Sequence, residues 1–179
     1  ALYLCAFDPA VQARARAEAR AALGPRAAQA KDLPALPYTR QIIDEALRLY
    51  PPAGIISRTA QRHDTLCGRQ VLPGDTVMVP IYALHRNHLL WENPDQFDPD
   101  RFAQRKAIDR YAYLPFGDGP RICIGASFAL QEAVIILATL LARFNFTPVP
   151  GRNPDPVMIL TLRPQGGVWL MAEPLGNSA

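Results

Sequence analysis

The sequence predicts a mainly α-helical chain with small antiparallel β-sheets, which is an α+β fold. Apolar residues recur at helical spacing in two long segments, 38–50 and 127–144. Between residues 55 and 80 the pattern changes to short β-prone runs that are separated by turn residues. The chain has 179 residues, of which 49% are apolar and 20% charged, so residues 1–179 are expected to form one folded unit or a piece of one.

The amino-terminal part is expected to begin with two helices. The apolar residues 1–7 follow no helix-start signal and the chain begins without Met, so they are interpreted as the end of a helix in a cleaved or truncated protein. A complete helix is predicted at 10–23. Asp8 is suited to its N-cap, Pro9 to its first turn and Gly24 to its end.

The rest of the chain combines short strands with one further long helix. The β-prone runs at 55–59, 65–72 and 76–79 predict a small antiparallel sheet. A short helix is expected at 82–87, an irregular loop at 93–102, a buried helix at 127–144 and a terminal hairpin between 158–162 and 167–172.

Composition excludes several classes of function. The net charge is only +3 and the arginines are scattered, which argues against a nucleic-acid partner. The longest apolar stretch, 133–142, is too short to cross a bilayer, so no membrane span is predicted. The three cysteines, Cys5, Cys67 and Cys123, lie far apart, which argues against a disulfide framework or a zinc site and favours a reducing, cytoplasmic setting.

Cys123 lies in Phe-Gly-Asp-Gly-Pro-Arg-Ile-Cys-Ile-Gly, residues 116–125, directly before the predicted long helix. A thiol at the start of a helix meets backbone N–H groups and the positive end of the helix dipole, which favour the thiolate that ligates metals. Glycines 117, 119 and 125 allow a close approach to a flat cofactor or a positive φ, and Arg121 is placed to pair with an anion. Taken alone, the same residues also fit a small buried cysteine after a turn.

The whole ten-residue pattern resembles the cysteine-ligand loop of cytochromes P450, Phe-x-x-Gly-x-Arg-x-Cys-x-Gly, at every fixed position. The matching residues are Phe116, Gly119, Arg121, Cys123 and Gly125. By that resemblance Cys123 is the axial ligand of haem b (iron protoporphyrin IX), where thiolate electron donation favours O–O cleavage. The resemblance also implies haem contacts from Pro115, Phe116, Gly117, Arg121, Ile122, Ile124, Gly125 and Ala129.

Glu45 and Arg48 are three residues apart and share one face of the helix predicted at 38–50. Such a pair is usually a surface ion pair that contributes only about 0.2 to 0.5 kcal/mol. Here it stands in Glu-Ala-Leu-Arg-Leu-Tyr-Pro-Pro, which resembles the K-helix Glu-x-x-Arg segment of the same family. With Arg101 in Pro-Asp-Arg-Phe, the resemblance implies a buried Glu/Arg/Arg network with the structural role of fixing the cysteine loop.

Other positions carry weaker implications. Arg58 matches a haem-propionate contact of many family members, or it is an ordinary strand arginine. Four apolar positions match the family's substrate pocket but fit core packing equally well: Ala53, Gly54, Ile55 and Leu160. His85 and His88 have no third ligand nearby, so they are interpreted as part of an ordinary connector and not as a metal site.

The similarity covers the chain from the family's J helix to its terminal hairpin, so the chain is expected to be the carboxyl-terminal portion of one cytochrome P450 domain, without the amino-terminal part and the I helix. The resemblance implies a parent haem-thiolate monooxygenase that takes electrons from a ferredoxin, flavodoxin or reductase and inserts one oxygen atom of O2 into a small apolar organic substrate. A peroxygenase or isomerase, or an inactive truncated fragment, are the alternatives. A membrane anchor on the missing amino terminus stays open, and Arg105, Lys106 and Arg110 form either a basic surface for the electron donor or a solvated loop.

Overall fold

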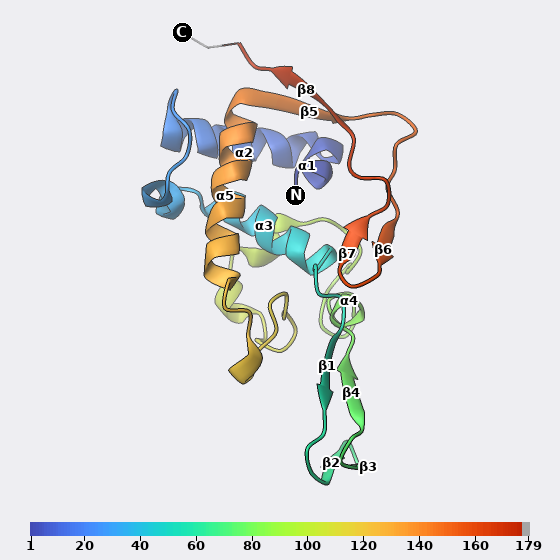
Figure 1. Cartoon of the computed structure of the whole chain (residues 1–179). Coiled ribbons are helices and arrows are strands. Elements are labelled where there is room, and N and C mark those ends of the chain that lie inside the picture. Colours follow the sequence, from blue (N-terminus) through green and yellow to red (C-terminus); the bar gives the residue numbers. More distant parts are fainter. Residues whose placement is uncertain (177–179) are drawn as a thin grey trace.

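The computed structural model describes residues 1–176, and within them helices pack beside four small two-stranded sheets (Figure 1). The α-helices are α1 (Leu2–Phe7), α2 (Pro9–Leu23), α3 (Pro37–Leu49), α4 (Ile81–Leu84) and α5 (Ala126–Arg143). Short 3-10 helices are η1 (Ala30–Ala35), η2 (Pro99–Phe102), η3 (Arg105–Ala107) and η4 (Gly119–Arg121). The predicted α+β class is therefore confirmed.

Carboxylate side chains satisfy free N–H groups at the starts of both α2 and α3. The carboxylate of Asp8 accepts hydrogen bonds from the backbone N–H groups of Ala10 and Val11, and Gly24 ends α2 with φ +57°. The predicted ends of this helix are confirmed, because both signals are local. At the start of α3 the carboxylate comes from another element: Glu18 of α2 accepts hydrogen bonds from the N–H groups of Tyr38 and Thr39.

The hydrophobic core lies where α2 and α3 pack against α5. Figure 1 shows α5 crossing beside both helices, with α1 and α2 at the end where the strand β5 follows α5. The fully buried side chains of this core include Cys5, Ala15, Ala19, Leu36, Ile42, Ala138 and Leu141. Their burial sets the position of α3, the helix that carries Glu45 and Arg48.

Helix α5 is longer than the apolar stretch 133–142, whose length was the reason for predicting no membrane span. Its 18 residues are long and apolar enough to cross a membrane, judged by length and composition alone. Val134, Leu137 and Leu141 of the same helix are buried in the core. Only 28% of the helix is buried, so these contacts do not decide its membrane behaviour, and the absence of a membrane span stays a prediction.

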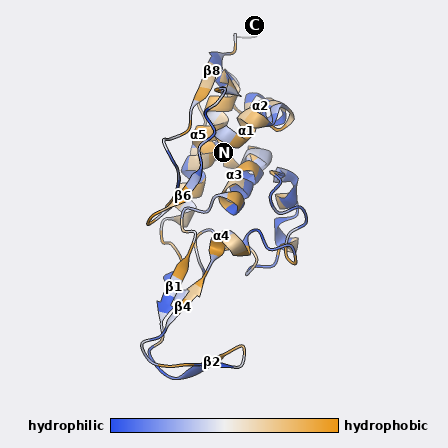
Figure 2. Ribbon diagram, turned by 90° about the vertical axis from the view of Figure 1, so that its right-hand side faces the viewer, coloured by the Kyte–Doolittle hydropathy of each residue, from blue (hydrophilic) through white to orange (hydrophobic). Residues whose placement is uncertain are grey.

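Strands β1 (Ile56–Thr59) and β4 (Thr76–Val79) form one antiparallel pair, and β2 (Asp64–Leu66) and β3 (Arg69–Val71) form another. Together they make an arm that extends away from the helices (Figures 1 and 2). The small antiparallel sheet predicted here is confirmed, although it is divided into two pairs.

The carboxyl-terminal strands pair differently from the prediction. They are β5 (Phe144–Pro148), β6 (Pro156–Met158), β7 (Leu162–Pro164) and β8 (Leu170–Pro174). The hairpin predicted between 158–162 and 167–172 is wrong, because β6 pairs with β7 while β8 pairs with β5. Phe144, which the helical pattern placed inside the preceding helix, instead begins β5, and Phe146, two residues later, is buried in the core.

Candidate functional site

Three charged side chains that the sequence singled out meet at the carboxyl-terminal half of α3. Glu45 and Arg48 are both completely buried, and the Arg48 guanidinium donates to both carboxylate oxygens of Glu45 at 2.6 and 2.8 Å. The Nε of Arg101 lies 3.4 Å from Glu45 Oε1, an ion pair without a hydrogen bond. The structure thus brings Glu45, Arg48 and Arg101 together as the resemblance implies.

Backbone groups satisfy the remaining polar atoms of Arg48 and bond one oxygen of Glu45. The Nη1 of Arg48 donates to the carbonyl oxygens of His85 at 2.8 Å and Pro94 at 2.6 Å, and its Nη2 donates to that of Gln96 at 3.1 Å. The backbone N–H of Asp98 donates to Glu45 Oε1 at 3.0 Å. The buried charges therefore fix the loop after α4 to α3, and such fully bonded pairs are costly to break on one side.

His85 lies next to the network, and the sequence interpretation missed its role. Its side chain is completely buried, with Nδ1 3.1 Å from the carbonyl oxygen of Arg48 and Nε2 2.8 Å from the backbone nitrogen of Leu114. Burial lowers the pKa of His85 from 6.5 to about 4, and the nearby positive charge of Arg48 also lowers it, so the ring is neutral at pH 7. Since both ring nitrogens are engaged, His85 and His88 do not form a metal site. One sequence signal existed: His85 stands four residues, about one helical turn, after the apolar Ile81, which is fully buried in the structure.

Tyr113 makes a second connection between the same loop and α3. Its hydroxyl group donates to Asp44, 2.9 Å from the carbonyl oxygen and 3.1 Å from the carboxylate. The ring stacks on His85 with centroids 5.4 Å apart and packs edge-on against Phe102 in a small aromatic cluster. Burial, with the negative charge of Asp44, raises the pKa of Tyr113 well above its ordinary value. Residues 113 and 114 are thus held to α3 at two points.

The segment 115–125, called here the Cys123 loop, continues from that attachment. The carbonyl of Leu114 accepts from the N–H of Gly117 at 3.1 Å, and the carbonyl of Phe116 accepts from the N–H of Cys123 at 3.0 Å. Gly117 and Gly119 have φ values of +73° and +71°, a conformation that favours glycine. Gly125 has φ −85° and is the N-cap of α5, so the positive φ considered for it is not found.

Cys123 is a free thiol on the surface, three residues before the first residue of α5. Apolar side chains beside it are also exposed: Ile122 by 54%, Ile124 by 103% and Phe128 by 72%. The other two cysteines are free as well, Cys67 exposed and Cys5 buried, where burial raises the pKa of the Cys5 thiol to about 11. No sulfur hydrogen bond to Cys123 is found among residues 1–176, so its predicted N–H donors stay a prediction.

Arg58 and Arg121 are both exposed, and within residues 1–176 neither forms an ion pair with a carboxylate. Arg121 belongs to the Cys123 loop itself. Arg58 lies on β1 two residues after Ile56, whose Cδ1 is 3.3 Å from the position of a Cβ built on Gly117. Since residues two apart share a face of a strand, Arg58 projects from the face of β1 that contacts the loop.

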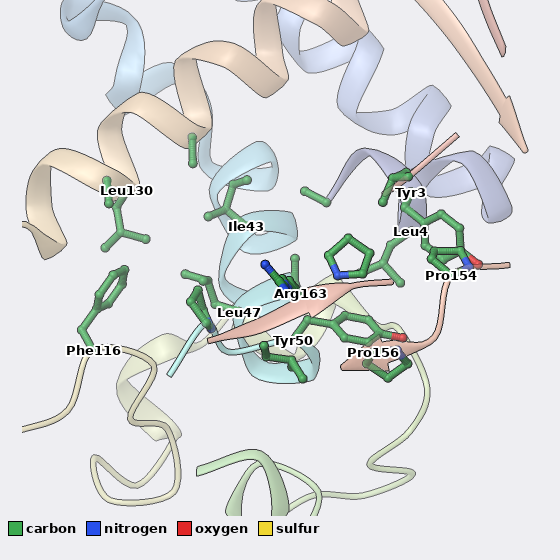
Figure 3. A pocket seen from close by; sticks show the side chains of 18 residues that line it. Tyr3, Leu4, Ile43, Leu47, Tyr50, Phe116, Leu130, Pro154, Pro156 and Arg163 are labelled. Carbon is green, nitrogen blue, oxygen red and sulfur yellow. The ribbon is translucent and has the colours of Figure 1, made fainter. Parts of the chain in front are cut away.

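A cavity of about 490 Å³ opens between α1, α3, α5 and the strands β6 and β7. Two of the predicted haem contacts, Phe116 and Ala129, line it, and Figure 3 shows Phe116 facing Leu130 at one end. The four positions expected in a substrate pocket do not line this cavity: Ala53, Gly54, Ile55 and Leu160. Gly54 is buried where a Cβ would overlap the end of Met158, and Leu160 is 91% exposed in the turn after β6.

Comparison with known proteins places this arrangement in one family. The family model described as Cytochrome P450 matches residues 1–171. Cyclooctatin synthase of Streptomyces melanosporofaciens is 41% identical over 168 residues, which are 92% of this chain and 37% of that protein. Taurochenodeoxycholic 6 alpha-hydroxylase of Sus scrofa is 39% identical over 171 residues, covering 94% of this chain and 34% of that protein. Cytokinin hydroxylase of Arabidopsis thaliana is 38% identical over 174 residues, covering 96% and 34%. The chain thus spans about a third of the length of these relatives.

Proposed function

Since this chain belongs to the cytochrome P450 family, we propose that it is the haem-ligating portion of a haem-thiolate monooxygenase. The parent protein is, in this proposal, a longer polypeptide that adds the parts of the family's fold that precede residue 1. The observation that carries the proposal is the placement of Cys123: a free, exposed thiol ahead of α5, on a loop whose base is bonded to His85 beside the buried ion pair of α3.

The residues around Cys123 fit haem b in their chemistry. Haem is a flat apolar ring with one metal ion at its centre and two carboxylates at its edge. The chain offers one thiol flanked by exposed apolar side chains, Ile122 and Ile124. Arg58 and Arg121 are arginines without carboxylate partners in residues 1–176, and guanidinium groups bind carboxylates well.

Each residue has a proposed task. The sulfur of Cys123 ligates the iron, and Arg121 and Arg58 bind the propionates. Ring contacts come from Pro115, Phe116, Gly117, Ile122, Ile124, Gly125 and Ala129. Glu45, Arg48 and Arg101 are proposed to have the structural task of fixing the Cys123 loop, through His85 and the segment 94–98 that they bond. A bound haem would supply the iron that activates O2 with two electrons, and electron donation from the thiolate would favour cleavage of the O–O bond.

The substrate is proposed to be a small apolar organic molecule. The cavity that Phe116 and Ala129 line is bordered mainly by apolar side chains, including Ile43, Leu47 and Leu130 (Figure 3). Two of the relatives are named as hydroxylases of different compounds, which supports a shared reaction and not a shared substrate. Ala53, Gly54, Ile55 and Leu160 remain proposed contacts to the substrate from outside this cavity.

The electron donor is proposed to be a ferredoxin, flavodoxin or reductase, with the protein in the cytoplasm. The basic residues considered for its docking surface are partly engaged within the chain: Arg110 pairs with Asp118 at 2.7 Å, and Arg105 lies over the ring of Tyr113 at 4.7 Å. These contacts favour the alternative that residues 105–110 form a solvated loop.

Turnover by the haem-loaded parent protein tests the proposal. With O2 and a reduced electron donor, we expect an apolar substrate to gain one oxygen atom, labelled when the gas is ¹⁸O2. Cys123→Ser should abolish this incorporation, while Cys67→Ser, which removes an exposed thiol from the arm, should retain it. Product formed only with peroxide would indicate a peroxygenase, rearranged product without added oxygen would indicate an isomerase, and no product from a protein that binds haem would contradict the proposal.

A further inference from the structure

Beside the bond of Tyr113 to Asp44, one imidazole ring links the base of the Cys123 loop to α3. The backbone N–H of Leu114 points at Nε2 of His85 across 2.8 Å, and Nδ1 of the same ring lies 3.1 Å from the carbonyl oxygen of Arg48. Leu114 directly precedes the Cys123 loop. The ring therefore bridges the end of α3 and the base of the loop.

The partners of the ring determine its protonation. A backbone carbonyl oxygen only accepts hydrogen bonds and a backbone N–H only donates them. The proton must therefore be on Nδ1, where it is donated to Arg48, and Nε2 must carry the lone pair that accepts from Leu114. A doubly protonated ring would direct an N–H group at the N–H of Leu114, and the lowered pKa of His85 agrees with its exclusion.

The bond to Arg48 is one half of a reciprocal contact. While the ring of His85 donates to the backbone of Arg48, the side chain of Arg48 donates to the backbone of His85 at 2.8 Å. The carbonyl of Arg48 lies in the last turn of α3, where carbonyl groups have no partner within the helix. His85 satisfies this group and is itself held in one orientation by the buried Arg48 and by the stacked ring of Tyr113.

A continuous series of hydrogen bonds then leads from the ring to the cysteine. Leu114 accepts from the N–H of Gly117 at 3.1 Å through its carbonyl, and Phe116 accepts from the N–H of Cys123 at 3.0 Å. We propose that His85 is a positioning residue for Cys123, because its neutral ring fixes the base of the Cys123 loop to α3 and thereby sets the direction of the thiol. This inference rests on the proposed role of Cys123 as the haem ligand.

Two substitutions separate the two bonds of the ring. In His85→Asn the side-chain amide has the reach of Nδ1, so it retains the bond to Arg48 but not the bond to Leu114. In His85→Gln the longer side chain has the reach of Nε2, so its oxygen can accept from Leu114 while the bond to Arg48 is lost. His88→Asn, at an exposed position three residues later, is the matched control.

The first readout is hydrogen exchange of the Leu114 amide in the haem-free parent protein. We expect exchange about tenfold faster in His85→Asn than in the wild type, and near wild-type exchange in His85→Gln and His88→Asn, because the Leu114 amide loses its hydrogen bond only in the first. The amide of Ile42 in the core of α3 reports global folding. Equal exchange of Leu114 in the Asn and Gln variants, with Ile42 protected, would overturn the proposal.

The second readout is the carbon-monoxide spectrum of the ferrous haem-loaded proteins. We expect the fraction with a thiolate signature to fall several-fold in His85→Asn and to be restored in His85→Gln. If both variants keep the wild-type spectrum, His85 does not position Cys123. If the wild type itself lacks the signature, the proposed haem ligation fails, whereas the amide exchange still tests the attachment of the loop.

A third measurement needs no variant and therefore applies even if both substitutions prevent folding. The ¹⁵N chemical shifts of the His85 ring in the wild type should show a protonated Nδ1 and an unprotonated Nε2. Protonation on Nε2 would contradict the bond to Leu114 and with it the proposal.

Discussion

The two ends of the segment 113–125 differ sharply in how the chain holds them. At its start, Tyr113 and Leu114 are bonded to α3 through Asp44 and His85, beside the fully buried Glu45 and Arg48. At its end, Cys123 is exposed, and its neighbour Ile124 has no cover at all. The difference teaches that this chain builds the base of the loop from its own contacts, whereas the sulfur stays accessible for ligation. Changes at the base should therefore alter stability, and changes at the exposed end should alter haem binding.

The largest effect on stability is expected from breaking the buried ion pair of Glu45 and Arg48, beside which the base of the loop is bonded. In Arg48→Met the carboxylate of Glu45 remains buried without its main partner, which should lower the free energy of unfolding by about 3 to 5 kcal/mol. Urea titration followed by far-ultraviolet circular dichroism measures it. The control Arg14→Met breaks the Arg14–Asp100 ion pair, in which both side chains are 55% exposed, and should cost several-fold less. Equal losses in the two variants would contradict the distinction between base and surface.

The next effect concerns pH. Because His85 has a pKa of about 4 in the folded protein and 6.5 when unfolded, the unfolded state binds the proton more readily. The neutral His85 ring therefore stabilises the folded protein fully above pH 6.5. This contribution to the free energy of unfolding is lost as the pH falls from 6.5 to 4, by about 3 kcal/mol in all. Urea titrations across this range measure it: between pH 6.5 and 4 the free energy of unfolding should fall further in the wild type than in His85→Gln, by that amount. Parallel pH profiles would show that the pKa of His85 does not differ between the folded and unfolded states.

A smaller effect is expected from Tyr113. Removing its hydroxyl in Tyr113→Phe deletes the buried bond to Asp44 and should lower the free energy of unfolding by about 1 kcal/mol. Tyr111→Phe is the control, since Tyr111 is 60% exposed and should tolerate the change. Thermal unfolding of both variants measures the difference, and a destabilisation confined to Tyr111→Phe would place the attachment of the loop elsewhere.

The smallest effect on stability is expected at the exposed end. Arg121→Gln should leave the free energy of unfolding unchanged, because Arg121 is exposed and forms no ion pair within residues 1–176, yet it should weaken haem binding several-fold by removing a propionate partner. Haem titration of the parent protein measures this, with Arg62→Gln on the exposed arm as the control. Equal haem affinity in both variants would remove Arg121 from the proposed site.

The sequence predicted local features of the fold well and long-range pairing poorly. Asp8 and Gly24 mark the ends of α2 because capping depends only on adjacent residues. The pairing of β5 with β8 was missed because Phe144 and Pro174 are separated by the whole of β6 and β7, and no local pattern records such contacts. The capping of α3 by Glu18 was invisible for the same reason.

The candidate site shows the same division. The resemblance placed Glu45, Arg48 and Arg101 in one network, and the structure brings them together. The role of His85 was missed because it depends on partners 37 and 29 residues away in the chain, Arg48 and Leu114. The spacing of His85 relative to His88 was considered for a metal site and rejected, whereas its spacing relative to Ile81, which the structure buries, was the informative signal.

The carbon-monoxide spectrum of the ferrous haem-loaded parent protein tests haem ligation by Cys123 most directly. Wild type and Cys67→Ser should both show the thiolate signature, because Cys67 lies in the turn of the β2–β3 pair, outside the Cys123 loop. Cys123→Ser should bind less haem and lose that signature entirely. A thiolate spectrum that survives in Cys123→Ser would show that another group holds the iron, and the account of this site would be contradicted.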